Sequence, residues 1–113
     1  MNLDVERSEG VAVVHVREPR LIYPLLGDFS STVTSLITGG ERKILVDFTG
    51  VGYVDSATIG CLMDLYRQGQ TAGATLKLSG VHKRVETMLA MTGARNFLEI
   101  HEDVAGAIRS FAG

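Results

Sequence analysis

Short apolar runs alternate with segments of helical periodicity over most of the chain, and this alternation limits the folds open to it. The apolar runs cover residues 44–48, 75–79 and 97–100, and the periodic segments separate and follow them. Strands and helices in strict succession form parallel crossovers, with the helices packed on a sheet. The sequence therefore predicts an α/β fold.

Two further β-type segments precede this alternation. Residues 3–8 alternate weakly, and residues 11–16 form a β-branched run, so the two predict an opening hairpin. Pro19 and Pro24 mark the loop that follows, and a helix can begin at Pro24 because its missing N–H costs nothing in the first turn. The predicted order is ββαβαβαβα, a small mixed sheet with packed helices.

The predicted helices are defined by apolar residues at helical spacing. Residues 44–48 should form the sheet centre, covered on both faces, because this run is almost wholly apolar. Glu102 and Asp103 are expected in the first turn of the last helix, where acidic side chains favour the helix dipole. The four stripes are Leu26, Phe29, Val33, Leu36 and Ile37; Ile59, Leu62, Met63 and Tyr66; Val85, Met88, Leu89 and Thr92; and Val104, Ala107, Ile108 and Phe111.

Length and charge narrow the class of protein. The 113 residues fit a single domain spanning residues 1–113. Eleven basic and thirteen acidic residues give a formal net charge of -2, which argues against nucleic acid or an anionic membrane as partner. No run approaches the ~20 apolar residues of a membrane span, and no signal peptide is evident. Cys61, the single cysteine, forms no internal disulfide, so a cytoplasmic protein is expected.

Catalytic and cofactor motifs are missing from the sequence. Neither GxxxxGK[ST] nor GxGxxG occurs, so no phosphate-binding loop is indicated. His15, His82 and His101 lie far apart, without the spacing that binds zinc on a helix. Ser56 has no GxSxG elbow around it. We therefore expect no enzyme, no metal and no small-molecule cofactor.

Ser56 stands at the junction of a loop and a helix. Sites in open α/β sheets gather in loops beyond the carboxyl ends of strands, and residues 49–55 form such a loop after the central strand. Ser56 is the expected N-cap, a role worth roughly 0.5–2 kcal/mol. Asp55 precedes it, and the small residues Ala57 and Gly60 leave the helix entrance uncluttered. Both a purely structural cap and a modified or recognised serine fit this pattern.

The run from Ile44 to Ser56, ILVDFTGVGYVDS, followed by a helix entry of small residues, resembles the signature of STAS domains, the fold of anti-sigma factor antagonists. Element order and length agree over almost the whole chain. The resemblance implies that an anti-sigma factor, a histidine-kinase-like serine kinase, phosphorylates Ser56. Unphosphorylated antagonist would bind that kinase and free its sigma factor, phosphorylation would cause release, and a PP2C-type phosphatase would reverse it. Asp47 matches an acidic position of the family, or simply bonds the loop backbone at the strand end.

The implied partner surface is an exposed rim around the loop and helix start, formed by Tyr53, Asp55, Ser56, Ala57 and Thr58, with Met63 expected in the core.

Two departures from the family pattern bear on this surface. Thr58 replaces a usual glycine, and the loop that helps bind the kinase carries Arg20 and Ile22 where an acid and an aspartate are common. They leave open an alternative in which the domain is a non-phosphorylated STAS scaffold, a subunit of a lipid-transport ATPase or of a stress-sensing complex. Ser56 would then be only a cap.

The effect of a phosphate at Ser56 on folding and on partner binding follows from its charge. A phosphoserine adds about -1.5 to -2 charges, and a helix N-terminus favours them. We therefore expect phosphorylation to leave the domain folded. Release must come from the partner, since like charges across an interface cost several kcal/mol.

Overall fold

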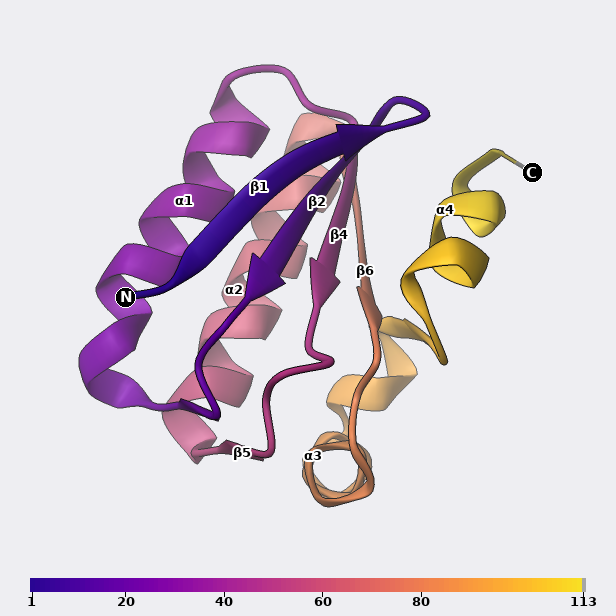
Figure 1. Ribbon diagram of the computed structural model, residues 1–113. Helices are drawn as coiled ribbons and strands as arrows, with labels where there is room; N and C mark the ends of the chain where they lie inside the picture. Colours follow the sequence, from indigo (N-terminus) through magenta and orange to yellow (C-terminus); the bar gives the residue numbers. More distant parts are fainter. Residues whose placement is uncertain (113) are drawn as a thin grey trace.

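A five-stranded mixed sheet forms the centre of the computed structural model, which describes residues 1–112 (Figure 1). The spatial order is β1-β2-β4-β6-β7; β1 pairs antiparallel with β2, and the other neighbours are parallel. The predicted mixed sheet is confirmed, with β4 at its centre. The strands are β1 (Leu3–Ser8), β2 (Val11–Val16), β4 (Lys43–Asp47), β6 (Thr75–Ser79) and β7 (Glu99–His101).

Helices cover both faces of this sheet. Helices α1 (Leu26–Thr38), α2 (Ser56–Ala72) and α3 (Lys83–Met91) pack on one face, and α4 (Val104–Ala112) packs on the other (Figure 1). Alternate residues of each strand point to opposite faces, so β2 supplies apolar side chains to both sides. The larger core includes Val14, Val16, Ile44, Val46, Phe29, Leu62 and Leu89, and the smaller one Val11, Val13, Leu45, Ala107 and Ile108.

Three predicted boundaries shift. Pro24 lies in a 3-10 turn, Tyr23–Leu25, and α1 begins at Leu26. A second 3-10 turn, Ala94–Asn96, moves the last strand from the predicted 97–100 to β7. Glu102 and Asp103 precede α4 instead of lying in its first turn, and the Asp103 carboxylate accepts a 2.7 Å hydrogen bond from the Gly106 N–H. Asp103 thereby satisfies a backbone donor that the helix itself cannot pair.

A second, two-stranded sheet was not predicted. Strands β3 (Arg20–Leu21) and β5 (Tyr53–Val54) pair in parallel, with Arg20 opposite Tyr53. Two residues are too few to show a period of two in the sequence. This small sheet holds the loop after β2 beside the start of α2, where the predicted site lies.

Candidate functional site

Ser56 is exposed and is the first residue of α2. The prediction that Ser56 is the N-cap is wrong, because Asp55 takes that role. Asp55 has extended backbone angles, and its Oδ1 accepts a 3.0 Å hydrogen bond from the Thr58 N–H. A carboxylate caps as well as a hydroxyl. The Ser56 side chain is consequently free of capping.

Asp55 links the turn at Tyr23 to the start of α2. Besides capping α2, it accepts a 2.8 Å bond from the Tyr23 N–H and a 2.8 Å bond from the Thr58 hydroxyl. Desolvation acts to raise the pKa of Asp55, but the bonds from Tyr23 and Thr58 outweigh it and lower the pKa below its usual value. Asp55 therefore stays ionised and clamps the turn at Tyr23 to the start of α2.

Thr58 is completely buried, so the prediction that it lies on the exposed rim is wrong. Its Oγ1 lies 2.7 Å from the Leu21 carbonyl oxygen and 2.8 Å from Asp55 Oδ1, and donates toward both acceptors. The third position of α2 faces β3, where a glycine would leave the Leu21 carbonyl without this donor. Thr58 thus ties β3 to α2, and of the two hydroxyls at the helix start only Ser56 is accessible.

The other predicted rim residues lie beside Ser56. Tyr53 is half-buried, and the Arg20 guanidinium carbon lies 5.2 Å from the centre of its ring, a cation-π contact. Ala57 is exposed. Met63 is half-buried and packs against the larger core, as expected.

A groove between the starts of α1 and α2 adjoins this rim, and sequence reasoning did not identify it. Its volume is about 690 Å³, and Tyr23 at its edge is 66% exposed. Small residues on facing helix turns open it, a pattern visible in the sequence only once the two helices are known to be neighbours. The groove is lined by Tyr23, Pro24, Leu26, Gly27, Ser30, Ala57 and Cys61.

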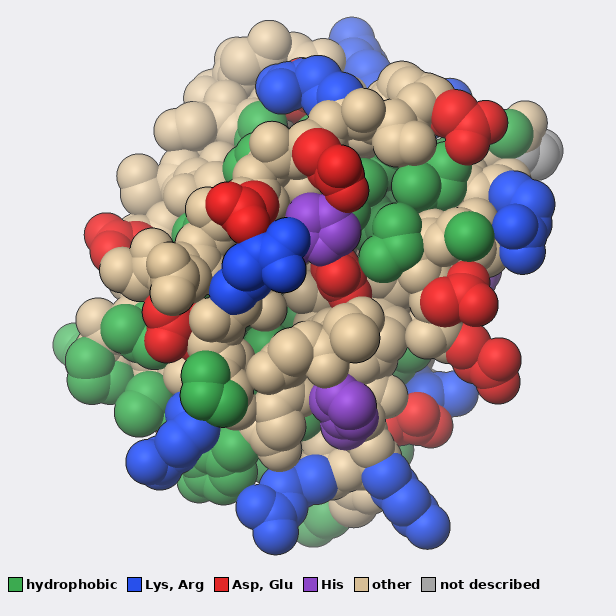
Figure 2. All heavy atoms as spheres, in the orientation of Figure 1, with side chains coloured by type: hydrophobic (Ala, Val, Ile, Leu, Met, Phe, Trp, Pro, Cys, Tyr) green, Lys and Arg blue, Asp and Glu red, His purple; other side chains and the backbone are tan. Residues whose placement is uncertain are grey.

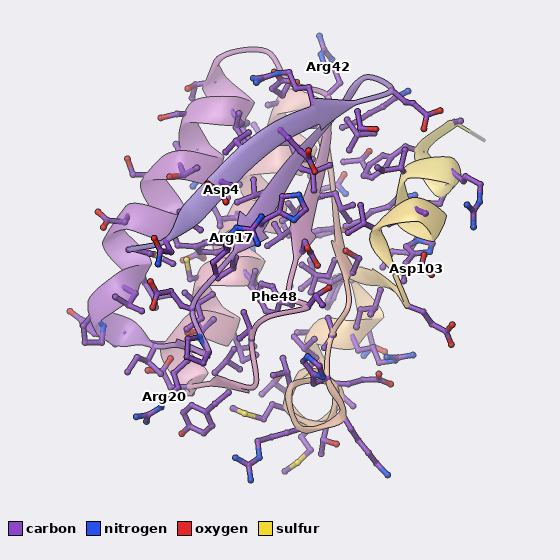
Figure 3. The ribbon with its side chains drawn as sticks, viewed as in Figure 1. Asp4, Arg17, Arg20, Arg42, Phe48 and Asp103 are labelled. Atoms are coloured by element: carbon purple, nitrogen blue, oxygen red, sulfur yellow. The ribbon has the colours of Figure 1, made fainter. Side chains whose placement is uncertain are left out.

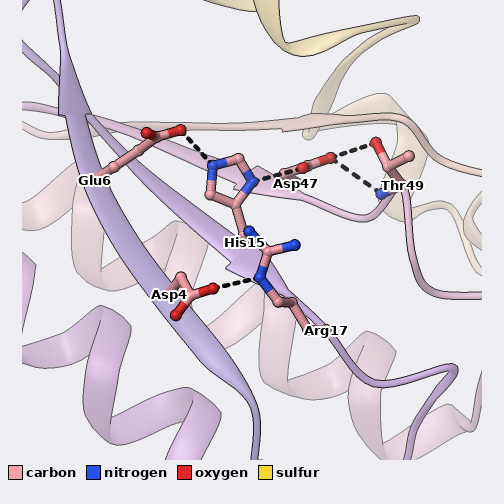
Figure 4. Close-up of polar contacts among 6 residues, drawn as sticks. All are labelled: Asp4, Glu6, His15, Arg17, Asp47 and Thr49. Atoms are coloured by element: carbon pink, nitrogen blue, oxygen red, sulfur yellow. Dashed lines mark hydrogen bonds and ion pairs between the residues drawn. The ribbon is translucent and has the colours of Figure 1, made fainter.

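Asp47 holds the beginning of the loop that leads to Ser56. Its Oδ1 accepts bonds from the Thr49 N–H at 3.0 Å and the Thr49 hydroxyl at 2.6 Å (Figure 4). Its Oδ2 lies 2.7 Å from His15 Nδ1, and His15 Nε2 lies 2.6 Å from a Glu6 oxygen. The prediction that Asp47 bonds the loop backbone at the strand end is therefore confirmed.

The pKa values of His15 and Asp47 move in opposite directions. Burial acts to lower the pKa of His15, but the hydrogen bonds to Glu6 and Asp47 outweigh it and raise the pKa. Burial acts to raise the pKa of Asp47, yet the bonds from Thr49 and His15 lower it. Both shifts favour a protonated imidazole between two carboxylates on the sheet face that α4 leaves open.

The remaining histidines serve local contacts. His82 Nε2 lies 2.6 Å from the Thr49 carbonyl oxygen, and His101 Nε2 lies within hydrogen-bond distance of a Glu99 carboxylate oxygen. Within residues 1–112, no three His, Cys, Asp or Glu side chains group as metal ligands, and no helix is long and apolar enough to cross a membrane.

Comparison with known proteins shows the family. The family model described as the STAS domain matches residues 2–107. An anti-sigma-factor antagonist (STAS) domain protein from Planctomyces limnophilus has a similar structure, with a TM-score of 0.90 at 20% identity, covering 98% of each chain. The phosphorylated form of the Bacillus cell fate determinant SpoIIAA superposes with a TM-score of 0.75 at 13% identity, covering 97% of this chain and 99% of that one.

The same fold also occurs inside a larger protein. The murine anion transporter Slc26a9 matches 91% of this chain with 18% of its own, at a TM-score of 0.76 and 19% identity. These likenesses are to the fold, and the family model covers nearly the whole sequence. The chain belongs to the STAS domain family.

Proposed function

We propose that this chain is an anti-sigma factor antagonist that works by partner switching in the cytoplasm. The unphosphorylated form binds an anti-sigma factor serine kinase and frees a sigma factor. Phosphorylation of Ser56 causes release, and a PP2C-type phosphatase restores the binding form. The antagonist itself is not an enzyme and carries no cofactor, since any ATP belongs to the kinase.

The observation that carries this proposal is that Ser56 is exposed, while Asp55 and Thr58 beside it make the hydrogen bonds that hold the helix start. Asp55 caps the helix and Thr58 is buried, so neither depends on the Ser56 hydroxyl. A kinase can reach Ser56, and the phosphate would lie at the positive end of α2. A Bacillus protein of the same fold, SpoIIAA, is described in a phosphorylated form, which supports this use of the fold.

The kinase would bind the rim around Ser56. Tyr53 and Ala57 supply contact surface, and the groove edged by Tyr23 extends it. Asp55 acts mainly as a clamp, and Thr58 positions β3 from within. A dianion at Ser56 would have to be dehydrated against this half-apolar surface, and each 1.4 kcal/mol of lost binding free energy is tenfold in the dissociation constant.

A second candidate keeps the fold and omits phosphorylation. The occurrence of the fold within a murine transporter supports STAS modules that act as parts of larger assemblies. This chain would then be a scaffold subunit of a lipid-transport ATPase or a stress-sensing complex. It should co-purify stably with that assembly, and Ser56 should remain unmodified.

The deciding experiment incubates the chain with ATP and the serine kinases of its own organism, followed by mass spectrometry. We expect the mass of one phosphoryl group on Ser56, lost in Ser56→Ala and kept in the exposed control Ser31→Ala. Ser56→Asp should weaken kinase binding while circular dichroism and thermal unfolding stay close to wild type. An unmodified Ser56, or kinase affinity unchanged by Ser56→Asp, would contradict the proposal.

A further inference from the structure

Three exposed cations at the end of the molecule that holds the proposed site lack acidic partners. Arg20 begins β3, and Lys83 and Arg84 begin α3; all three are exposed. Among residues 1–112, no carboxylate oxygen lies within 4.0 Å of their charged nitrogens, although most other cations are paired. The paired ones are Arg7 with Glu41, Arg17 with Asp4, Arg67 with Asp64, Lys77 with Glu99 and Arg95 with Glu86. We call Arg20, Lys83 and Arg84 the basic rim.

The fold places the basic rim at the same end as Ser56. Arg20 pairs in register with Tyr53, three residues before Ser56. Helix α3 packs on β5, and the 2.6 Å contact between His82 and the Thr49 carbonyl ties its start to the same loop. Figure 3 shows Arg20 at this end, far from Arg42, and Figure 2 shows basic side chains gathered along the lower end of the molecule, over α3 and β5.

The acidic groups nearby offset only part of this charge. Asp55 adds one negative charge beside Ser56, and three hydrogen bonds from Tyr23 and Thr58 hold its carboxylate in place. Glu86 on α3 is paired with Arg95 at 2.9 Å. A chain of formal net charge -2 therefore still has an excess of positive charge at the end of the molecule that holds its proposed phosphorylation site.

We propose that the basic rim binds an acidic surface of the kinase. This inference rests on the proposed function and specifies the chemistry of its partner. The basic rim has only three cations, Arg20 stacks on the ring of Tyr53, and the apolar groove edged by Tyr23 lies near Ser56. Such a mixture suits a folded protein surface, whereas nucleic acid calls for a longer basic stripe.

The basic rim also explains how one phosphate can act as a switch. Three positive charges attract the acidic partner before modification, and a phosphate of about -1.5 to -2 charges cancels much of that attraction. The same dianion faces the partner carboxylates directly, and like charges at an interface are repelled. Phosphorylation thus cancels most of the local positive charge without a change of fold.

The test measures association rates with the kinase that phosphorylates Ser56, over a range of salt concentrations. The triple variant R20E/K83E/R84E should associate at least about tenfold more slowly at 0.15 M salt, because steering depends on complementary charge. The difference should largely vanish at 1 M salt, where the Debye length is about 3 Å. Arg42→Glu, an exposed cation at the opposite end, is the matched control. The variant K83E/R84E repeats the test without disturbing the contact between Arg20 and Tyr53.

The outcomes separate this inference from the proposed function. If Ser56 is phosphorylated but association ignores salt and charge reversal, the partner surface is not acidic and the inference fails alone. If no kinase modifies Ser56, the proposed function fails, and an NMR titration with poly-L-glutamate still tests whether the basic rim binds an acidic surface. Shifts confined to Arg20, Lys83 and Arg84 would support it, and scattered or absent shifts would overturn it. Duplex DNA bound more tightly than about 1 μM at 0.15 M salt would instead indicate nucleic acid as the ligand.

Discussion

Thr58→Val tests the physical basis of the site, because it removes one buried hydroxyl and nearly preserves the side-chain shape. Thr58 is fully buried, and its Oγ1 lies 2.7 Å from the Leu21 carbonyl and 2.8 Å from Asp55 Oδ1. A hydroxyl has one proton, so the two acceptors share it. Valine leaves both without this donor, and Asp55 keeps its bonds from the Tyr23 and Thr58 N–H groups.

The expected cost follows from this inventory. Little cavity is created, since valine fills the same volume, and the loss is that of a buried hydrogen bond with a partner left unsatisfied. Such losses are about 1–3 kcal/mol. A domain of this size has an unfolding free energy of about 5–15 kcal/mol, so the change should be well resolved.

Urea unfolding followed by circular dichroism measures this change. With a slope of about 1–3 kcal/mol per molar urea, the midpoint should fall by roughly 1 M while the slope stays constant. Thr71→Val, an exposed position in the same helix, should change the unfolding free energy by less than about 0.5 kcal/mol. If Thr58→Val is as stable as wild type, Thr58 does not tie β3 to α2 and the proposed division of roles around Ser56 is refuted.

Three further perturbations test other parts of the structure. Asp55→Ala removes the cap of α2 and the acceptor of the Tyr23 N–H, so thermal unfolding at neutral pH should show a loss of about 1 kcal/mol; no loss would refute the clamp. The pKa of His15 is raised in the folded state, so its contribution to the unfolding free energy is complete below the unfolded-state pKa of 6.5 and is lost as pH rises through the folded-state pKa. His15→Gln should abolish this fall in unfolding free energy. Equal urea midpoints of wild type and His15→Gln from pH 5 to 9 would contradict the pairing of His15 with Asp47. In the wild-type protein, the contribution of Asp47 to the unfolding free energy should disappear as pH falls below about 3.8, because the pKa of Asp47 is lowered in the folded state. Gly80→Ala places a Cβ 2.3 Å from Thr49 Oγ1 at a φ of +68°, so it should destabilise by more than about 1 kcal/mol, and a neutral result would contradict the close approach.

The main sheet could be predicted because each of its parts has a local cause. The run at residues 44–48 is apolar at every core position, and α2 carries its apolar residues at helical spacing, so both elements are visible without tertiary information. Pro24 misled the prediction of the helix start, since proline suits the first turn of a 3-10 helix as well as that of an α-helix.

The structure confirms that Ser56 is exposed, as the sequence predicts, but it changes the roles of two neighbours, Asp55 and Thr58. Ser56 was found from its place after a glycine-containing loop. The choice between Ser56 and Asp55 as cap depends on backbone angles that adjacent residues of similar propensity do not reveal. Thr58 was assigned to the surface because β3, the strand that covers it, is two residues long and leaves no periodic trace. The basic rim depends on the packing of α3 against β5, which lies about thirty residues earlier in the chain.

The displacement of the cap from Ser56 to Asp55 strengthens the case for a switch. If Ser56 capped α2, esterifying its oxygen would disturb the bond to the helix backbone, and modification would compete with helix stability. Here the capping bond belongs to Asp55 and the link to β3 belongs to Thr58, so a phosphate on Ser56 alters neither. The new charge would lie near the Asp55 carboxylate, but three donors already hold that group in place, and the helix N-terminus offsets part of the repulsion. In the proposed switch, the added charge should therefore change the affinity of the surface around Ser56 for its partner and leave the stability of the domain nearly unchanged.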